Sequence, residues 1–297
     1  MTRIVTAFLP LPVSFSHSKC LCQGILRLLE IIFSALAFIL VIFRGVMVSP
    51  WGVWCEFVWF FCICVPVVLT VMEAKSWQIL LAAFLPDWTD LTCGLTLLCG
   101  MMIISATIIY GVVFVYFASV VSILCLIASL IATVVFLVDG VMQKMKCPSG
   151  YMCSLRGNLR ITESFIACII LTAATDHFVF APWYFRPYVM LCSSFLIAIC
   201  LIVTVLIIVL NLLTKLLCLQ CIKLNMMEFL FNIAAVLAYL LAILIWCIFG
   251  YKRYNYNPYI CVGCNFADMN TVTIGAIVNL VFYLTFTLQY IIFVKVL

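Results

Sequence analysis

The chain has 297 residues and a formal net charge of +5, and 68% of its residues are hydrophobic while only 8% are charged. Soluble domains carry roughly a quarter charged residues and about half apolar ones, so composition excludes a soluble globular protein. The length leaves room for several membrane crossings of about 20 residues each and for little else, which predicts a polytopic membrane protein. No basic stripe with interleaved aromatic residues is present, so we expect no nucleic-acid partner.

The first 24 residues precede the first long apolar run. Arg3 followed by an apolar patch is typical of the start of a signal peptide. Pro10 and Pro12 interrupt that patch, however, and no small-x-small cleavage pattern follows it. We therefore expect residues 1–24 to form a short cytoplasmic tail.

Eight apolar segments are long enough to span a bilayer, and each should be a helix because a backbone in lipid must satisfy its own hydrogen bonds. The third and fourth are separated only by a tight turn predicted near Gly111. The predicted fold class is thus an all-α integral membrane protein with eight transmembrane helices. In chain order these cover approximately Leu28–Val48, Cys55–Val71, Leu91–Tyr110, Val113–Val138, Ile161–Phe180, Tyr188–Leu210, Phe229–Phe249 and Val272–Phe293.

A polar break at residues 139–160 divides these segments into four and four. Both halves open on the same pattern, LRLLE at residues 26–30 and LRITE at residues 159–163, an offset of 133 residues. An even number of spans in each half makes the two repeats parallel in the membrane. We predict one four-helix domain at 25–146, a cytoplasmic linker at 147–158 and a second four-helix domain at 159–297.

Lys and Arg predict the orientation, because cytoplasmic loops carry an excess of them. With both termini cytoplasmic, the outer side holds Arg44, Arg186, Lys252 and Arg253. The other eleven basic residues then lie on the inner side: Arg3, Lys19, Arg27, Lys75, Lys144, Lys146, Arg156, Arg160, Lys215, Lys223 and Lys295. Trp and Tyr cluster at the predicted outer ends, where amphipathic rings suit the headgroup layer.

The shared opening places an arginine and a glutamate three residues apart on one helix face, as Arg27 with Glu30 and as Arg160 with Glu163. One interpretation is an interfacial ion pair that fixes helix depth, with the arginine reaching toward lipid phosphates. The other makes the glutamates proton or ion ligands. We favour the first, because these residues lie at the predicted edge of the membrane.

Most of the eighteen cysteines lie in apolar runs, where a free cysteine packs as a small hydrophobe. Cys261 and Cys264 fall in the last predicted outer loop, where a disulfide could form. Six others lie near cytoplasmic helix ends, where reversible palmitoylation and unmodified thiols are equally consistent with the sequence: Cys20, Cys22, Cys147, Cys153, Cys218 and Cys221.

Catalytic patterns are lacking. The two histidines are His17 and His177, and no metal-ligand spacing, P-loop or Gly-x-Ser-x-Gly elbow occurs. We predict a protein that is not an enzyme and that uses no cofactor or metal. Helix contacts have a clearer basis, because Ala234, Ala238 and Ala242 form a stripe of small residues that lets backbones approach in lipid. Such a stripe serves folding and oligomerisation equally well.

Several short motifs carry a family resemblance. In chain order they are SATIIY at Ser105–Tyr110, GYM at Gly150–Met152, ESFIACII at Glu163–Ile170, Asp176, Tyr239-x-x-Ala242-x-x-x-Trp246, and FVKV at Phe293–Val296. With these motifs, each half resembles a MARVEL domain, the four-helix module of membrane-trafficking and membrane-apposition proteins. Two such domains in tandem resemble the myeloid-associated differentiation marker family, including its marker-like members.

The resemblance implies a non-enzymatic protein of plasma or vesicular membranes that organises or sorts lipid-ordered domains. Its implied partners are membrane lipids, including those of cholesterol-rich domains, and other membrane proteins or further copies of itself. The outer loop between the third and fourth segments is nearly absent here, and the tail lacks a long Ser/Thr-rich stretch, so functions that rest on those regions are not carried over. The alternative is a small transporter or channel that uses the interior of the helix bundle.

Overall fold

The computed structural model describes residues 13–45, 47–77, 88–115, 119–146, 150–180, 187–213, 224–251 and 266–296. Within these ranges the chain is helical apart from short turns, and it contains no strand. Eight helices in this described part of the chain are long and apolar enough to cross a membrane, which confirms the predicted fold class of a multi-pass all-α protein. Of the expected tail, residues 13–24 already belong to the first helix.

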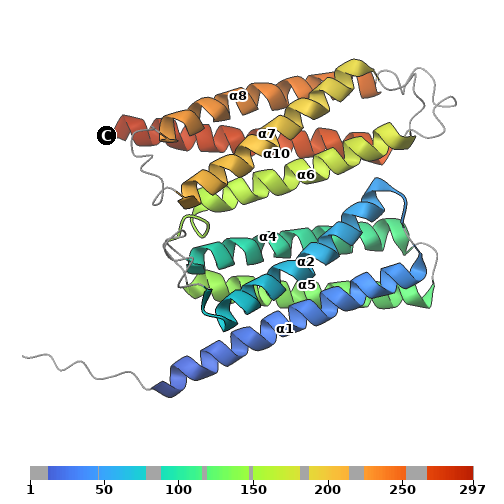
Figure 1. Ribbon diagram of the computed structural model, residues 1–297. Coiled ribbons are helices and arrows are strands. Elements are labelled where there is room, and N and C mark those ends of the chain that lie inside the picture. Colours follow the sequence, from blue (N-terminus) through green and yellow to red (C-terminus); the bar gives the residue numbers. More distant parts are fainter. Residues whose placement is uncertain are drawn as a thin grey trace, which may run out of the picture.

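Figure 1 shows the helices arranged in two groups that follow chain order. The first group consists of α1 (Val13–Arg44), α2 (Pro50–Ala74), α4 (Trp88–Ile109) with its extension η1 (Tyr110–Phe114), and α5 (Val120–Lys146). The second consists of α6 (Leu155–Phe180), α7 (Tyr188–Leu213), α8 (Leu224–Ile245) with its extension η4 (Trp246–Tyr251), and α10 (Phe266–Val296). We call these groups the first and the second unit.

Each unit is held together mainly by contacts among its own helices. In the first unit α1 packs against α2 and α5, and α4 packs against α2 and α5. In the second unit α10 packs against α6 and α8, while α7 lies against both α6 and α8. Helix α6 also touches α2 and α4, so the first helix of the second unit forms the joint between the units. The start of α1 and the end of α10 lie at the same end of the molecule (Figure 1). The domain boundaries 25–146 and 159–297 stay predictions.

Apolar side chains cover the outside of the bundle, and polar side chains turn inward. Phe43, Val112 and Ile202 are 81%, 74% and 65% exposed, whereas Arg27 and Arg160 are only 2% and 0% exposed. This arrangement suits a chain whose solvent is lipid, because polar groups there must find partners inside the protein. The burial pattern therefore agrees with membrane insertion.

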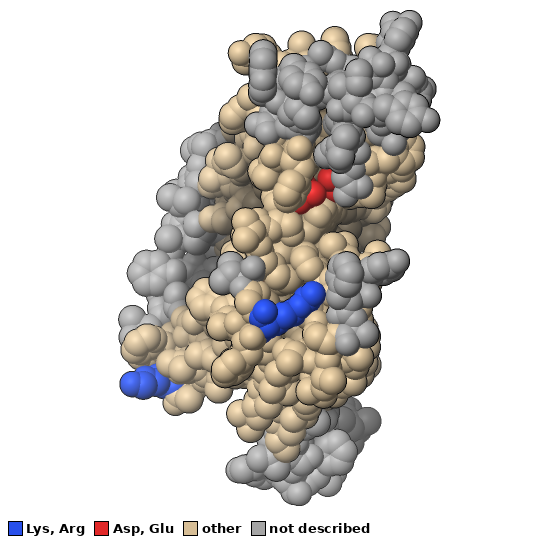
Figure 2. All heavy atoms as spheres, turned by 90° about the vertical axis from the view of Figure 1, so that its right-hand side faces the viewer, with Lys and Arg blue, Asp and Glu red and all other residues tan. Residues whose placement is uncertain are grey.

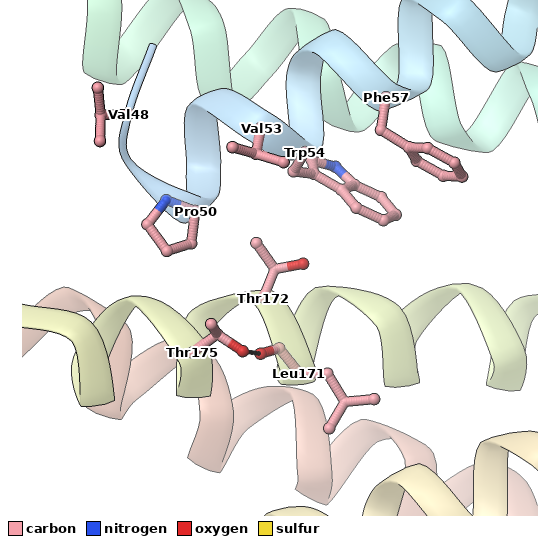
Figure 3. Close-up of a pocket in the computed structure, with 8 residues that line it drawn as sticks. All are labelled: Val48, Pro50, Val53, Trp54, Phe57, Leu171, Thr172 and Thr175. Atoms are coloured by element: carbon pink, nitrogen blue, oxygen red, sulfur yellow. Dashed lines mark hydrogen bonds between the residues drawn. The ribbon is translucent and has the colours of Figure 1, made fainter.

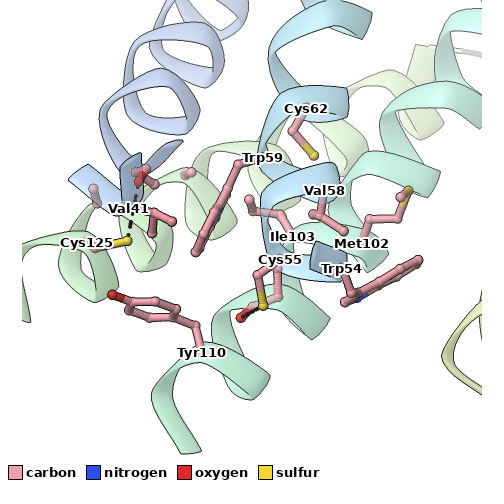
Figure 4. Packing of buried hydrophobic residues seen from close by; sticks show 14 of the residues in the cluster. Val41, Trp54, Cys55, Val58, Trp59, Cys62, Met102, Ile103, Tyr110 and Cys125 are labelled. Carbon is pink, nitrogen blue, oxygen red and sulfur yellow. Dashed lines mark hydrogen bonds between the residues drawn. The ribbon is translucent and has the colours of Figure 1, made fainter. Parts of the chain in front are cut away.

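Large aromatic residues fill the centre of each unit and use small hydroxyl residues as hydrogen-bond partners. In the first unit the Trp59 ring meets Tyr110 edge-on with centroids 5.3 Å apart (Figure 4), and its indole donates to Ser129 Oγ at 3.1 Å. In the second unit the Trp246 indole donates in the same way to Ser193 Oγ at 3.1 Å. The indole N–H would otherwise be unsatisfied in lipid.

The turn between α1 and α2 follows local rules. Gly45 ends α1 with a φ of 110°, a left-handed conformation that glycine adopts without steric cost. Ser49 then caps α2, because its hydroxyl accepts from the Gly52 amide at 3.1 Å, and Pro50 occupies the first helical position.

The boundary predicted near Gly111 is wrong. Gly111 lies in the π-helical turn η1, which carries the third span to Phe114, and α5 begins at Val120 instead of Val113. Arg44 explains the extension, since its guanidinium donates to the Phe114 carbonyl at 2.8 Å and to the Tyr110 hydroxyl at 3.2 Å. The last carbonyl groups of a helix have no partner within the helix, and this long-range contact supplies a hydrogen-bond donor to one of them.

The alanine stripe of α8 runs from the exposed side of the helix to its buried side. Ala242 is buried, but Ala238 is only partly covered and Ala234 is exposed. Positions four residues apart drift by about 40° around a helix, so a stripe at i, i+4 and i+8 turns away from a fixed neighbour. The buried residues of α8 and its extension η4 include Asn232, Ala235, Tyr239, Ala242 and Trp246.

Candidate functional site: two buried charge clusters

Arg160 is the centre of a charged cluster inside the second unit. Its guanidinium donates to Glu163 Oε2 at 2.7 Å, to Glu228 Oε1 at 2.9 and 3.1 Å, and to Asn232 Oδ1 at 2.5 Å. Glu163 is the neighbour three residues along α6, whereas Glu228 and Asn232 come from α8. One guanidinium therefore links the first and third helices of the unit.

The charges in this cluster balance. Arg156, one turn before Arg160, forms a second ion pair with Glu228. Two arginines thus face two glutamates, Glu163 and Glu228. The Arg160 guanidinium also lies 4.2 Å from the centroid of the Phe286 ring, which covers it from α10. A desolvated arginine is tolerable here because both partner charges and an aromatic face surround it.

A polar chain continues from this cluster into the other two helices. Asn279 on α10 donates to the Glu163 carbonyl at 3.1 Å and to the Tyr239 hydroxyl at 3.0 Å. The Tyr283 hydroxyl lies 2.8 Å from Thr204 Oγ1 on α7. Each helix of the second unit therefore contributes a polar side chain to the interior.

Arg27 and Glu30, the matching residues of the first unit, contact other partners. Arg27 forms its ion pair with Glu73 near the end of α2. The Glu30 side chain is in hydrogen-bonding contact with Asp139 of α5, and the Gln143 amide donates to Asp139 Oδ2 at 2.6 Å. Three carboxyl groups thus accompany a single arginine in the described part of this cluster.

The residues of the two predicted charge pairs lie within α1 and α6, but their environment differs from the one expected. Sequence reasoning expected the arginines to reach toward lipid phosphates. The side chains of Arg27, Glu30, Arg160 and Glu163 are instead at most 2% exposed, because the neighbouring helices cover them. Arg160 bonds the glutamate three residues on, whereas the recorded ion pair of Arg27 is with Glu73.

Sequence reasoning missed the partners that complete these clusters. Glu228 and Asn232 sit four residues apart near the start of α8, and Asp139 and Gln143 sit four residues apart near the end of α5. Polar pairs at helical spacing inside an apolar run were the available signal. From this spacing, the two members of each pair could have been assigned to one face of their helix. The residues that they contact on other helices could not.

A second acidic pair lies at the opposite end of the second unit. Asp176 near the end of α6 is in hydrogen-bonding contact with Asp268 near the start of α10. The Trp51 indole of α2 donates to Asp268 Oδ1 at 3.0 Å. His177 is 3% exposed and packs edge-on against Trp246. This contact joins the two units, because Trp51 belongs to the first and Asp268 to the second.

An apolar groove follows the joint between the units (Figure 3). Its volume is about 480 Å³, and Val53, Trp54 and Phe57 of α2 face Leu171, Thr172 and Thr175 of α6 across it. The hydroxyls of Thr172 and Thr175 donate to carbonyls of their own helix at 2.9 and 2.7 Å. The groove therefore offers mostly carbon atoms to an occupant.

Comparison with known proteins places these features in a family context. A myeloid-associated differentiation marker-like protein 2 from Xenopus laevis is 26% identical over 280 residues, which cover 88% of this chain and 89% of that protein. Myeloid-associated differentiation markers from Pongo abelii and Homo sapiens are 28% and 27% identical over 259 residues, which cover 83% of this chain and 77% of each. The chain is similar to these markers over most of its length. No family model and no solved structure matches it.

The similarity to the differentiation markers confirms the resemblance drawn from the sequence motifs. It also supports the coarse assignment as a multi-pass membrane protein, and the relatives' names denote markers and no reaction. In the described residues no group of three or more His, Cys, Asp or Glu side chains could hold a metal ion.

The GYM motif that carried this resemblance forms the loop before α6. The Asp90 carboxylate of α4 accepts from the backbone amides of Met152 at 2.9 Å and Cys153 at 3.1 Å. Gly150 is needed there, because an added Cβ would overlap the Asp90 carboxylate. Burial, and then the nearby Glu228 carboxylate, raise the pKa of the Tyr151 hydroxyl above its ordinary range, so that group stays neutral. The loop thus ties the second unit to the first.

The predicted cysteine sites are resolved only in part. Cys153 in this loop is buried against Cys93 of α4, and this position does not fit a lipidated thiol. Cys147, Cys218, Cys221, Cys261 and Cys264 lie outside the described residues, as do the side chains of Cys20 and Cys22. Palmitoylation of the remaining five candidates and the outer disulfide stay predictions.

Proposed function

We propose that the protein is a non-enzymatic membrane organiser that sorts lipid-ordered domains and associates laterally, with tandem MARVEL-type units. The observation that carries this proposal is the distribution of side chains. Large apolar residues point outward along the membrane-spanning helices, while the charged residues described above are paired inside each unit. Such a protein meets its surroundings within the membrane mainly through lipid and through other helices.

The groove at the joint supports the same function. Its lining of Val53, Trp54, Phe57 and Leu171 matches lipid chains in polarity. The two threonines in it have already bonded their hydroxyls to their own helix, so they hold no free donor for a polar solute. This chemistry favours lipid contact over recognition of a water-soluble ligand.

Both termini are proposed to face the cytoplasm of a plasma or vesicular membrane. Figure 2 looks onto the end of the molecule where α1 finishes, and the described atoms there show few Lys and Arg side chains. Most basic residues in the sequence belong to the other end by the predicted topology. Cytoplasmic loops of membrane proteins carry an excess of Lys and Arg, which supports this orientation.

Partitioning between membrane phases tests the proposal. The labelled full-length protein, purified from cells that palmitoylate membrane proteins, is reconstituted into giant vesicles in which ordered and disordered phases coexist. We expect enrichment in the ordered phase, and a decrease in a variant with all five remaining candidates changed to Ser: Cys20, Cys22, Cys147, Cys218 and Cys221. The matched control changes Cys93, which is buried, to Ser and should partition like wild type. Exclusion of the wild-type protein from the ordered phase would contradict the sorting function.

Lateral association is measured in the same vesicles by energy transfer between two labels at low protein density. We expect transfer that decreases when unlabelled protein is added, because copies exchange partners. Transfer no higher than that of a monomeric membrane control would contradict self-association.

The buried carboxyl groups favour one alternative, a small transporter or channel. A flux assay with purified protein in vesicles distinguishes the two functions. Flux that disappears in Glu30→Gln and Glu163→Gln variants would overturn the organiser in favour of a transporter.

A further inference from the structure

The Glu30 and Asp139 carboxyl groups are in direct contact inside the first unit. Both residues are 1% exposed, and their side chains are in hydrogen-bonding contact between α1 and α5. An ionised carboxylate can only accept hydrogen bonds, so two carboxyl groups in such contact need a hydrogen atom between them. The contact itself therefore calls for one bound proton.

The surrounding charges do not remove this need. Arg27 is the nearest arginine on α1, and its recorded ion pair is with Glu73. The second unit places two arginines against two glutamates at the corresponding position. The first unit places one arginine against Glu73, Glu30 and Asp139. Two adjacent carboxylates in a low-dielectric interior cannot both stay ionised. The described residues supply one arginine for three carboxyl groups, so a proton must supply part of the missing positive charge.

Gln143 indicates which carboxyl group carries the proton. Its amide donates to Asp139 Oδ2 at 2.6 Å and to Thr96 Oγ1 at 3.0 Å. A donor directed at Asp139 stabilises the ionised form of that residue. Among the described residues, Glu30 Oε1 has no hydrogen-bond partner, and neither has Gln143 Oε1, although both side chains are at least 96% buried. Glu30 is thus the group left to hold the hydrogen.

We propose that the first unit contains a proton-binding site in which Glu30 donates to the Asp139 carboxylate. Among the described residues, the other titratable or charged groups that act on this site are Arg27 on α1 and Cys62 on α2. Glu73 on α2 pairs with Arg27, and Cys99 on α4 contacts Cys62. The site takes up one proton per chain from water. This inference does not depend on the proposed role in lipid organisation.

Proton binding makes the stability of the folded protein depend on pH. The folded chain holds a proton that an unfolded chain releases above the ordinary carboxyl range, so raising the pH favours unfolding. One proton changes the unfolding equilibrium constant by about tenfold per pH unit while the two states differ by that proton. Glu30→Gln keeps a donor toward Asp139 and removes the proton requirement.

The experiment compares Glu30→Gln with Glu163→Gln, the same substitution at the matching position of the second unit. Unfolding of the full-length protein in lipid nanodiscs is followed from about pH 5 to about pH 9. We expect Glu30→Gln to unfold no more readily than wild type at neutral pH and less readily at the alkaline end. Glu163→Gln should unfold more readily at every pH, because it takes a counter-charge from Arg160.

Infrared spectroscopy reads the proton directly and does not require a stable variant at high pH. Wild-type protein should show the C=O band of a neutral carboxylic acid, shifted in heavy water. Part of that band should be missing in Glu30→Gln and retained in Glu163→Gln. Where Glu30→Gln fails to fold, Asp139→Asn replaces it.

Three results would overturn the proposal. The first is equal destabilisation of Glu30→Gln and Glu163→Gln at every pH, which would mean that Glu30 is ionised and paired with Arg27. The second is a carboxylic acid band that Glu30→Gln and Asp139→Asn leave unchanged. The third is stabilisation of the wild type by sodium at alkaline pH that is absent from Glu30→Gln, because the site would then hold a metal cation instead of a proton.

Discussion

Replacing Arg160 by methionine should destabilise the second unit strongly. The substitution keeps an unbranched apolar side chain but removes the guanidinium that bonds Glu163, Glu228 and Asn232. Glu228 retains Arg156, whereas Glu163 loses its recorded ion-pair partner while staying 1% exposed. An uncompensated buried charge of this kind costs about 3–5 kcal/mol. We expect a loss of that order in the free energy of unfolding.

The measurement is reversible unfolding of the purified protein in mixed micelles. Arg156→Met is the matched control, because Arg156 is 36% exposed and belongs to the same cluster. A pair that reaches solvent contributes about 1 kcal/mol or less. The double variant Arg160→Met with Glu163→Gln should recover at least about 1 kcal/mol, since it removes the stranded charge. A loss below about 1 kcal/mol for Arg160→Met would refute the reasoning that the cluster is charged and desolvated.

Three further tests probe contacts elsewhere in the molecule with the same unfolding assay. Gly150→Ala should lower the free energy of unfolding by about 2 kcal/mol or more, because the added Cβ meets the Asp90 carboxylate. Gly100→Ala should be neutral or stabilising, because its Cβ meets nothing within 4 Å. Equal effects of the two substitutions would contradict this reasoning. Ala235→Leu at a fully buried position should lose about 1–3 kcal/mol, and Ala234→Leu on the exposed face should change stability by less than about 0.5 kcal/mol. The reverse order would mean that Ala234, and not Ala235, lies on the inner face of α8. Trp51→Phe removes the bond to Asp268 and should cost about 1–2 kcal/mol, and no change would show that this contact does not help to hold the units together.

The number and type of helices could be predicted from the sequence, because the bilayer imposes a length and an apolar composition on every span. All eight predicted segments overlap a helix long and apolar enough to cross a membrane. Exact helix ends could not be predicted where a distant residue decides them. Gly111 is typical of a turn, yet Arg44 from α1 binds the carbonyl of Phe114 and draws the helix past it.

Which side of a helix faces the protein interior is harder to predict than where the helix lies in the sequence. A transmembrane helix is apolar all round, so hydropathy does not tell the lipid side from the protein side. The alanines at 234, 238 and 242 are small, but Asn232 and Tyr239 decide which side of α8 turns inward, since their polar atoms need partners. Buried polar residues therefore indicate the inner face of a membrane helix better than small residues do.

The duplicated opening LR-x-x-E shows how two copies of one pattern acquire different chemistry. In both units the arginine and glutamate start on the same face of the first helix. In the second unit α8 supplies Glu228, so Arg160 stays between two carboxylates and the glutamates are compensated. In the first unit α4 supplies Thr96 to the cluster, Arg27 turns to Glu73 on α2, and Glu30 is left beside Asp139. The first helix fixes where the charges lie, and the polar residues of the other three helices decide whether those charges are neutralised by arginine or by a proton.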